Sequence, residues 1–459
     1  MTTRRLILIF LITAAAGGGL LLPVSANTGP AVMPALALTV FTVGMWATGA
    51  MPEHYASVAF FVLALVFQIA PVEVIFSGLK SSAFWLIAGG MVIGVSADRT
   101  GLGRYLAHAF VRRLNKSYLQ LITGIVIGAV ALAFLIPAAI ARLIILMPIV
   151  LGLADQLGFK TSDRGRTGMV LATTFACFFI PLTILPANLP NVVLAGVAES
   201  LYGLKITYGF YLLMQFPVTG ALKGVLIVAI IHFLFRQTIP NPGQSDGPPP
   251  SLSPEGKRLA VIVGVTLCVW ATDFVHGISP GWVAIGTALA CLMPGVGVVK
   301  PGAFRQTKGF QTLFFVAAVL ALGSVVANSG AGSLITDGLL ALNEFRPDNP
   351  ANTYWAFSAI SMVISLFATL PGAIVVLAPF ANDVAIAAGV PVMSILMVMV
   401  NGFSTVFFPY QSAPLLIGIR LGSVTLIDGL KVCLPLAMLT VILLLPLNYL
   451  WWTWLGHLK

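Results

Sequence analysis

The feature that most restricts the fold of this chain is a series of apolar runs, each close to 20 residues long, that continues from one end to the other. A helix of about 20 apolar residues is long enough to span a bilayer. The amino acids are 59% hydrophobic and 8% charged, whereas about a quarter of the residues in a soluble domain carry charge. The sequence therefore predicts an integral membrane protein without a separate soluble domain.

The spanning segments are predicted to be helices. Residues 225–235 and 261–270 are almost continuously apolar, whereas the strands of an outer-membrane barrel alternate polar and apolar residues over short segments. A barrel is therefore excluded, and the predicted fold class is an all-α polytopic membrane protein.

The formal net charge of +10 does not indicate nucleic-acid binding, because the basic residues lie mostly in short loops between apolar runs, where they set topology. The four cysteines are far apart in apolar segments and the five histidines are scattered, so no disulfide, metal site or cofactor is predicted. We find no cluster of His, Asp or Glu of the kind that a membrane enzyme needs, and no catalytic residue is predicted.

Residues 1–30 are predicted to form a first transmembrane helix. Arg4 and Arg5 precede an apolar run, and Val24-Ser25-Ala26 is similar to a signal-peptidase site, so a signal peptide is the alternative. We favour a retained helix because the apolar run of residues 6–23 is long for a signal peptide. Either way, the two arginines place the N-terminus in the cytoplasm, and we expect a multi-pass protein of a bacterial-type inner (plasma) membrane.

A proline- and glycine-rich stretch divides the chain into two halves. Residues 237–258 include Pro248-Pro249-Pro250, and such a composition neither packs into a core nor crosses lipid. We interpret it as a cytoplasmic linker between a first repeat of residues 31–236 and a second repeat of residues 259–459. About 11 crossings are predicted, near residues 6–24, 31–50, 55–71, 82–98, 167–200, 208–235, 259–275, 280–298, 312–328, 391–420 and 430–455.

Two further apolar stretches, residues 118–155 and 352–390, are long enough for two helices each but are interrupted midway by proline and small residues. Turns are predicted at residues 136–139 and 370–373. Both stretches are interpreted as re-entrant hairpins whose tips line a site, because non-helical backbone at membrane depth needs protein or water to satisfy its hydrogen bonds.

The charges around the hairpins predict that the two hairpins enter from opposite faces of the membrane. Basic residues flank the first hairpin and place its ends in the cytoplasm. They are Arg99, Arg104, Arg112, Arg113, Lys116, Lys160, Arg164 and Arg166. The second hairpin is flanked by Asp337, Glu344, Arg346 and Asp348, without a basic excess. Because each repeat has an odd number of crossings, the second repeat is predicted to be inverted relative to the first.

Sequence similarity between the halves supports an inverted repeat. Residues 97–103 align in register with residues 326–332, and the glycines that both segments share, Gly101 with Gly330 and Gly103 with Gly332, are predicted to end helices and to permit close packing. Farther on, prolines interrupt one helix at residues 186–191 and another at residues 409–414. Discontinuous helices expose half-helix N-termini, which attract anions, and two opposed hairpins suit alternating access better than a channel.

Three segments resemble the divalent anion/sodium symporter (DASS) family of the ion-transporter superfamily: residues 84–103, residues 190–196 and the loop Pro409-Tyr410-Gln411-Ser412. The resemblance extends over nearly the whole chain. It implies a homodimer in which each protomer has a scaffold and a mobile transport domain, and elevator-type transport of dicarboxylates, citrate or sulfate. In that family both hairpin tips bear a Ser-Asn-Thr triplet, which together with the two broken-helix loops holds sodium and the substrate carboxylates.

This chain departs from the family at both hairpin tips. The two triplets fall on Ala138-Ala139-Ile140 and Thr369-Leu370-Pro371, which lack nearly all the hydroxyl and amide oxygens that would replace the water around a sodium ion. This argues against sodium coupling and leaves the coupling ion, sodium or a proton, open. The predicted substrate- and ion-binding residues are Ala138, Ala139, Arg142, Asn188, Asn191, Thr369, Gly372, Tyr410, Gln411 and Ser412.

Arg142 lies two residues beyond the first altered triplet, at a depth where a cation is costly unless it is used. We hypothesise that its guanidinium is an internal counter-ion that binds a carboxylate or sulfate in bidentate fashion and replaces the charge of sodium. The alternative is that Arg142 reaches the cytoplasmic surface or pairs with Asp155 or another carboxylate.

The predicted function is secondary active transport of a small anion by alternating access. Its partners are the anion, the lipid bilayer and a second copy of the chain, with no nucleic acid. The alternatives are a cation/proton antiporter or an oxyanion efflux permease of the same superfamily and, more remotely, a membrane-embedded enzyme. Carboxylates at the broken helices would favour cation exchange, but neither loop contains Asp or Glu, so an anion is preferred.

Overall fold

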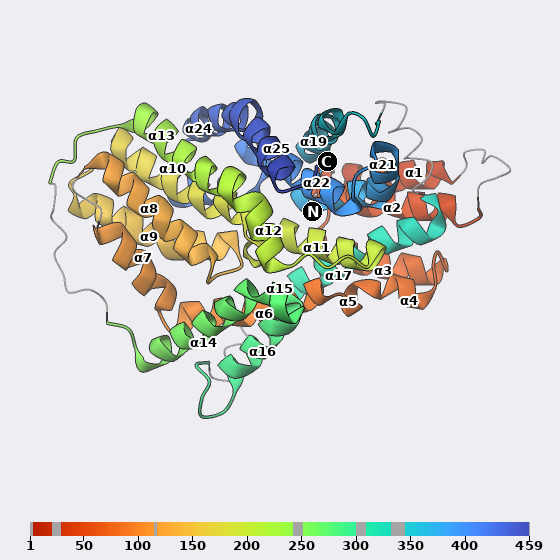
Figure 1. The fold of residues 1–459 in the computed structure, drawn as a ribbon, viewed down its shortest axis with the longest axis horizontal. Coiled ribbons are helices and arrows are strands. Elements are labelled where there is room, and N and C mark those ends of the chain that lie inside the picture. Colours follow the sequence, from red (N-terminus) through yellow and green to blue (C-terminus); the bar gives the residue numbers. More distant parts are fainter. Residues whose placement is uncertain are drawn as a thin grey trace.

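The computed structural model describes residues 3–20, 29–113, 117–241, 251–299, 309–331 and 345–458. The regular elements in these residues are all helices (Figure 1), which confirms the predicted all-helical fold. Several features of the sequence lie outside the described residues: residues 24–26, the triple proline at 248–250, Lys116, Asp337 and Glu344.

The helices before the linker are α1 (Thr3–Gly19), α2 (Val32–Thr48), α3 (Glu53–Val66), the short α4 (Val72–Ile75) and α5 (Ser77–Lys80), α6 (Ser82–Arg99), α7 (Leu102–Arg113), α8 (Tyr118–Ala133), α9 (Ala139–Gln156), α10 (Arg164–Phe179), α11 (Leu189–Tyr202), α12 (Tyr208–Gln215) and α13 (Lys223–Phe235). Those after it are α14 (Pro254–Ala271), the short α15 (Asp273–His276), α16 (Pro280–Leu292), α17 (Gly309–Ser329), α19 (Pro350–Phe367), α20 (Leu370–Leu377), α21 (Ala381–Ala388), α22 (Val392–Phe403), α23 (Ala413–Leu421), α24 (Leu426–Leu439) and α25 (Leu445–Trp454).

The second half of the chain repeats the order of elements seen in the first. Glycines in the left-handed conformation follow α6 and α17, Gly101 at φ 74° and Gly330 at φ 76°. Glycine adopts this conformation at little cost, so it commonly terminates helices, and the predicted helix ends at Gly101 and Gly330 are confirmed. The prediction for Gly103 was wrong, because this glycine lies in the first turn of α7, and Gly332 lies outside the described residues. In both halves a pair of packed helices, a broken helix and a long final helix come after this glycine.

The long final helix of each half contains a π-helical turn. In the first half this turn is η3 (Phe216–Leu222), between α12 and α13, and in the second it is η7 (Thr440–Leu444), between α24 and α25. Pro217 lies within the first turn and Pro446 close to the second, and proline removes one hydrogen bond of the regular helix. Because π-helical turns are rare, finding one at the same place in both halves supports an internal repeat.

Six helices among the described residues are long and apolar enough to cross a membrane, judged by length and composition: Ala139–Gln156, Arg164–Thr183, Tyr208–Phe235, Gln311–Ser329, Leu370–Ala388 and Leu426–Trp454. Two of these are the second arms of the predicted hairpins. Length therefore does not distinguish a re-entrant arm from a full crossing in this chain. Other apolar helices, such as α2 and α16, are shorter, and the total of about 11 crossings stays a prediction.

Each predicted hairpin forms a pair of packed helices. The helices α8 and α9 join through residues 134–138, in agreement with the predicted turn. The second turn lies at Ala368 and Thr369, so its prediction at residues 370–373 was wrong, because those residues already begin α20. Pro371 occupies the first turn of α20, where a helix has no use for the missing N–H group.

The hairpins and broken helices of the two halves interlock. The helices α8 and α9 pack against α10, and α19 packs against α22. Contacts between the halves join α9 to α23 and α20 to α11. In Figure 1, α8, α9, α10 and α13 lie together on one side of the molecule, and α1, α2 and α3 lie on the other.

A second group of helices, α6, α14 and α16, packs together, and α6 and α14 contact α7 (Figure 1). Glycines let α6 and α16 approach closely: a Cβ atom on Gly281 would collide with the carbonyl oxygen of Ser82, and one on Gly89 would lie 2.6 Å from the Ala284 backbone. The hydroxyls of Thr266 on α14 and Thr287 on α16 are 2.7 Å apart. These contacts make the three helices one tightly packed unit.

Candidate functional site

The first broken helix is interrupted between α10 and α11. The helix α10 ends at Phe179 and α11 begins at Leu189, with two short 3-10 turns, Ile180–Thr183 and Leu185–Ala187, between them. The break therefore starts earlier than the predicted residues 186–191. Its residues are buried, so the carbonyl groups that leave the helix need hydrogen-bond donors from elsewhere in the protein.

Arg142 on α9 supplies donors to this break. Its side chain is fully buried, and its Nη1 donates to the carbonyl of Ile136 at 2.5 Å and to that of Ala187 at 2.8 Å. Its Nη2 and Nε both donate to the carbonyl of Cys177, at 2.9 and 3.3 Å. Arg142 thus joins the tip of the first hairpin to both ends of the first break.

The alternative interpretation of Arg142 from the sequence is wrong. A side chain with no exposed surface does not reach the membrane surface, and Asp155 forms its ion pair with Arg166. The two tip residues Ala138 and Ala139 offer only backbone groups. Ala138 precedes α9 without a side-chain cap, and its carbonyl accepts from the Arg142 amide at 3.1 Å.

Two asparagines hold the unwound backbone of the first break. Asn188 Nδ2 donates to the Phe178 carbonyl at 3.2 Å, and Asn191 Nδ2 donates to the carbonyls of Pro181 and Ile184 at 3.0 and 2.8 Å. The Oδ1 atom of Asn191 is buried without a hydrogen-bond partner among the described residues. No side chain caps the N-terminus of α11, so this half-helix end is available to an anion.

The second broken helix has the same plan. The helix α22 ends at Phe403 and α23 begins at Ala413, so the break both starts and ends earlier than the predicted residues 409–414. Gln411 Oε1 accepts from the amides of Phe407 and Phe408 at 2.9 and 2.8 Å, and Gln411 Nε2 donates to the Ser365 carbonyl on α19 at 3.2 Å. Gln411 therefore joins the second break to the second hairpin. Arg142 joins the first break to the first hairpin in the same way.

Buried hydroxyl groups without partners gather near this second break. Ser412 precedes α23, is 4% exposed and does not cap the helix. Its hydroxyl, and those of Ser404 and Ser365, have no partner among the described residues. Buried polar atoms are nearly always paired, so each such atom needs an explanation, such as a bound ion or water.

Three other predicted site residues have different surroundings. Tyr410 is 64% exposed and stacks on Phe408 with ring centroids 5.4 Å apart, so its hydroxyl does not face the buried break. Thr369 accepts from the Gly372 amide at 3.3 Å and caps α20. Thr369 and Gly372 therefore shape the second hairpin, whose arm α20 packs against α11.

Lys223 is the residue that the sequence interpretation missed. It begins α13, is 1% exposed and donates from Nζ to the carbonyl of Ser404 at 3.1 Å. The same ammonium lies 5.6 Å from the centroid of the Phe179 ring, at the end of α10. Lys223 thus joins the two breaks. A single lysine among apolar helical residues is the signal that would have found it.

The electrostatic arrangement is alike at the two breaks. The C-terminal ends of α10 and α22 face the buried basic side chains of Arg142 and Lys223, whereas the N-terminal ends of α11 and α23 have no side-chain cap. A helix carries partial negative charge at its C-terminus and partial positive charge at its N-terminus. In the described part of the chain neither cation is paired with a carboxylate; the ion pairs there include Arg166 with Asp155 and Lys431 with Asp428.

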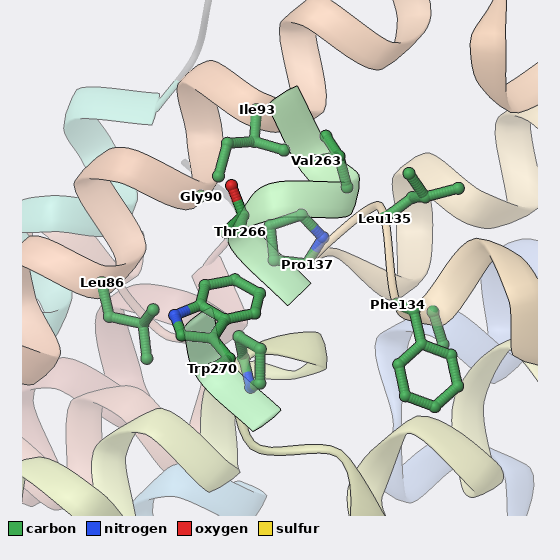
Figure 2. A pocket seen from close by; sticks show the side chains of 11 residues that line it. Leu86, Gly90, Ile93, Phe134, Leu135, Pro137, Val263, Thr266 and Trp270 are labelled. Atoms are coloured by element: carbon green, nitrogen blue, oxygen red, sulfur yellow. The ribbon is translucent and has the colours of Figure 1, made fainter. Parts of the chain in front are cut away.

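A shallow cleft lies where the tip of the first hairpin meets α6 and α14. Figure 2 shows Phe134 and Leu135 of the tip at the right, Leu86 of α6 at the left, and Pro137 of the tip in the middle, close to Val263, Thr266 and Trp270 of α14. The lining is mostly apolar, so the tip contacts the neighbouring helices without a network of hydrogen bonds.

Known proteins resemble this chain over most of its length. A "Membrane protein" of Cupriavidus necator is 22% identical, covering 83% of this chain and 76% of that protein. "Dicarboxylate transporter 2.1, chloroplastic" of Arabidopsis thaliana is 25% identical, covering 83% and 70%. "L-tartrate/succinate antiporter" of Escherichia coli strain K12 is 22% identical, covering 82% and 79%.

The fold is similar to that of a solved transporter. The YdaH transporter of Alcanivorax borkumensis, described as having an unusual topology, aligns with a TM-score of 0.54 at 15% identity and covers 85% of this chain and 88% of its own. The family described as "Sodium:sulfate symporter transmembrane region" matches residues 3–458. This chain therefore belongs to the sodium:sulfate symporter family and is a secondary transporter of small anions.

Proposed function

We propose that this transporter carries dicarboxylate dianions across a bacterial-type inner membrane by alternating access. The observation that carries the proposal is the pair of half-helix N-termini, at α11 and α23, that have no side-chain cap, together with the unpartnered hydroxyl of Ser412 before α23, which can donate to an anion. Discontinuous helices in transporters direct such N-termini at anionic substrate groups. Two of them suit the two carboxylates of one substrate.

The names of two relatives support this substrate class over sulfate or citrate. One is named a dicarboxylate transporter and the other an L-tartrate/succinate antiporter. A cation/proton antiporter would need carboxylates at the breaks, and residues 180–191 and 404–412 contain no Asp or Glu. The anion is therefore the better substrate, and membrane enzyme chemistry has no support.

The proposed movement is of the elevator type. The hairpins and broken helices form the mobile domain, and α6, α14 and α16 belong to the scaffold, with the apolar cleft between them. The repeats, residues 31–236 and 259–459, are inverted around the cytoplasmic linker of residues 237–258. The N-terminus is cytoplasmic, and two copies of the chain form a homodimer.

The experiment that tests the function is uptake by proteoliposomes. Purified protein is reconstituted into vesicles loaded with unlabelled succinate, and the entry of labelled succinate, L-tartrate, citrate and sulfate is measured. We expect saturable entry of a C4-dicarboxylate that exceeds entry of sulfate and citrate. If a monodisperse, correctly folded preparation moves none of these anions, the proposed function is wrong.

A further inference from the structure

We propose that the carboxylates of Glu199 and Asp273 form a two-part latch that fixes the corner between α11 and α12 to the helices of the proposed scaffold. Each transport movement has to open this latch. This inference rests on the proposed function, because it takes the hairpins and broken helices to move past α6, α14 and α16. It goes further by naming the contacts that hold the mobile domain in the described conformation.

The first part of the latch is the Glu199 carboxylate of α11, which lies at the N-terminus of α6. Its Oε2 accepts from the hydroxyl of Ser81 at 3.1 Å, and from the amide and the hydroxyl of Ser82 at 2.9 and 2.7 Å. A helix N-terminus carries partial positive charge and free N–H groups, so it favours a carboxylate. Hydrogen bonds to a charged acceptor are also stronger than neutral ones. A helix of the proposed mobile domain thus caps a helix of the proposed scaffold.

The second part has the same chemistry in the opposite direction. Asp273 begins α15, between the scaffold helices α14 and α16, and is 1% exposed. The amide of Tyr208, the first residue of α12, donates to Oδ2 of this carboxylate, and the amide of Gly209 donates to Oδ1 at 3.4 Å. The hydroxyl of Thr207 accepts from the next amide of the helix, that of Phe210. Each group of helices therefore supplies a carboxylate to a helix N-terminus of the other group.

Packing adds to these hydrogen bonds. The Tyr208 ring stacks on Trp270 of α14, with ring centroids 5.6 Å apart. Ile206, in the loop between α11 and α12, is 4% exposed and lines a small cleft together with Pro280 and Gly281 of α16. The corner is therefore held by directional bonds as well as by buried surface, whereas the tip of the first hairpin meets α6 and α14 at a mostly apolar cleft.

The latch lies away from the proposed substrate site. Glu199 follows Leu189, the first residue of α11, by ten residues, and this spacing corresponds to roughly 15 Å along a helix. Opening the latch breaks hydrogen bonds to two carboxylates without involving the N-terminal ends of α11 and α23 that are proposed to face the substrate. Removal of either negative charge should therefore favour opening.

The first experiment measures how often the corner opens. Ile206→Cys is introduced into a protein without other cysteines, and the rate at which a charged maleimide modifies it is measured in the purified protein. A buried thiol reacts only when the corner opens, so this rate follows the open fraction. We expect Glu199→Gln and Asp273→Asn each to raise the rate about 3- to 10-fold, because each weakens hydrogen bonds to a charged group. The double variant should raise it by the product of the two factors.

Two controls separate the latch from general loosening of the protein. Asp428→Asn should leave the modification rate of Ile206→Cys unchanged, because Asp428 also lies at a helix N-terminus but bonds to Thr425 and Lys431 beside it in the chain. Lys205→Cys, at an exposed position of the same loop, should react rapidly and equally with and without Glu199→Gln. Unchanged modification of Ile206→Cys in folded Glu199→Gln and Asp273→Asn proteins would overturn the latch.

The second experiment locks the corner and measures transport, and it decides the question if the first variants do not fold. A Cβ atom on Gly209 would lie 3.4 Å from Asp273 Oδ1, so Gly209→Cys with Asp273→Cys, in a protein without other cysteines, is close enough for a disulfide. We expect oxidation to abolish succinate exchange in proteoliposomes and reduction to restore it, whereas Gly209→Cys alone should be insensitive to oxidation.

The outcomes distinguish the latch from the proposed function. Full exchange with the Gly209→Cys and Asp273→Cys pair cross-linked would refute the latch while leaving dicarboxylate transport intact. Absence of transport by the unaltered protein would refute the proposed function instead.

Discussion

At the scale of single residues, the two breaks contain polar atoms of two kinds. Some form hydrogen bonds to backbone groups of the protein, as Arg142 does in four hydrogen bonds and Gln411 in three. Others, including the Ser412 hydroxyl and Asn191 Oδ1, are buried without a partner among the described residues. The first kind should matter for stability, and the Ser412 hydroxyl, which can donate to an anion, should matter for substrate affinity.

Ser412→Ala tests the second kind. The hydroxyl has no hydrogen-bond partner among the described residues, so we expect an unchanged unfolding temperature and a KM for succinate raised about 3- to 10-fold, which corresponds to one lost hydrogen bond. Thr369→Ala is the control with the opposite pattern, because it removes the cap of α20 and should cost about 1 kcal/mol of stability. Equal KM values for Ser412→Ala and the unaltered protein would remove Ser412 from the site.

Arg142→Met tests the first kind. It leaves the carbonyls of Ile136, Cys177 and Ala187 buried without their donor, and each unpaired group costs on the order of 1–3 kcal/mol. We expect a clear fall in the unfolding temperature of the purified protein. Arg420→Gln, an exposed position at the end of α23, should change it little. An Arg142→Met protein as stable as the control would show that the arginine does not hold the hairpin to the break.

At the scale of elements, close helix packing distinguishes α6 and α16. These helices approach through Gly281 and Gly89, where side chains would meet the backbone of the partner helix. In contrast, a Cβ atom on Gly286, also in α16, would find no atom within 4 Å. In α16, close packing therefore requires a glycine at position 281 but not at position 286.

The same substitution at both glycines tests this packing. Gly281→Ala should lower stability by about 1–3 kcal/mol, because the added methyl group forces α6 and α16 apart. Gly286→Ala should be neutral or should stabilise by up to about 1 kcal/mol, since alanine favours a helix over glycine. Thermal unfolding of both variants in the same detergent gives the comparison, and equal values would contradict the close approach.

At the scale of the whole molecule, the two groups of helices have different kinds of contact. The hairpins and broken helices are held together by hydrogen bonds from Arg142, Lys223 and Gln411. The contact between the first hairpin tip and α6 and α14 is a mostly apolar cleft (Figure 2). The cleft at the tip offers little resistance to sliding, whereas at the other end of α6 Ser81 and Ser82 donate three hydrogen bonds to the Glu199 carboxylate of α11, which a movement between α6 and α11 would have to break.

Cross-linking tests this division. A Cβ atom on Gly90 would lie 2.9 Å from a side-chain atom of Pro137 across the cleft, so Gly90→Cys with Pro137→Cys, in a protein without other cysteines, should form a disulfide. We expect oxidation to stop exchange and reduction to restore it. The control pair, Thr266→Cys with Thr287→Cys, joins α14 to α16 within the proposed scaffold and should leave exchange unchanged on oxidation. Full exchange with the first pair cross-linked would contradict movement at the cleft.

Much of the local structure could be predicted because its causes are local. Apolar runs of spanning length, the glycines after α6 and α17 and the prolines within the breaks each act within a few residues. The second hairpin turn was misplaced by two residues because a proline can begin a helix as well as interrupt one. The extent of each break was also underestimated, since buried side chains decide where an unwound segment finds donors.

The sequence by itself determined a helical membrane protein of two similar halves, with two hairpins, two broken helices and a cation near the first tip. Only the tertiary structure decided which groups meet there. Arg142 bonds to carbonyls 35 and 45 positions along the chain, and Lys223 bonds to one 181 positions away, so no local pattern reports these contacts. Tyr410 and Ser412 are equally polar neighbours in the sequence, but one is exposed and the other buried. The packing of distant helices selects which face of each segment is enclosed, and that choice assembles the site.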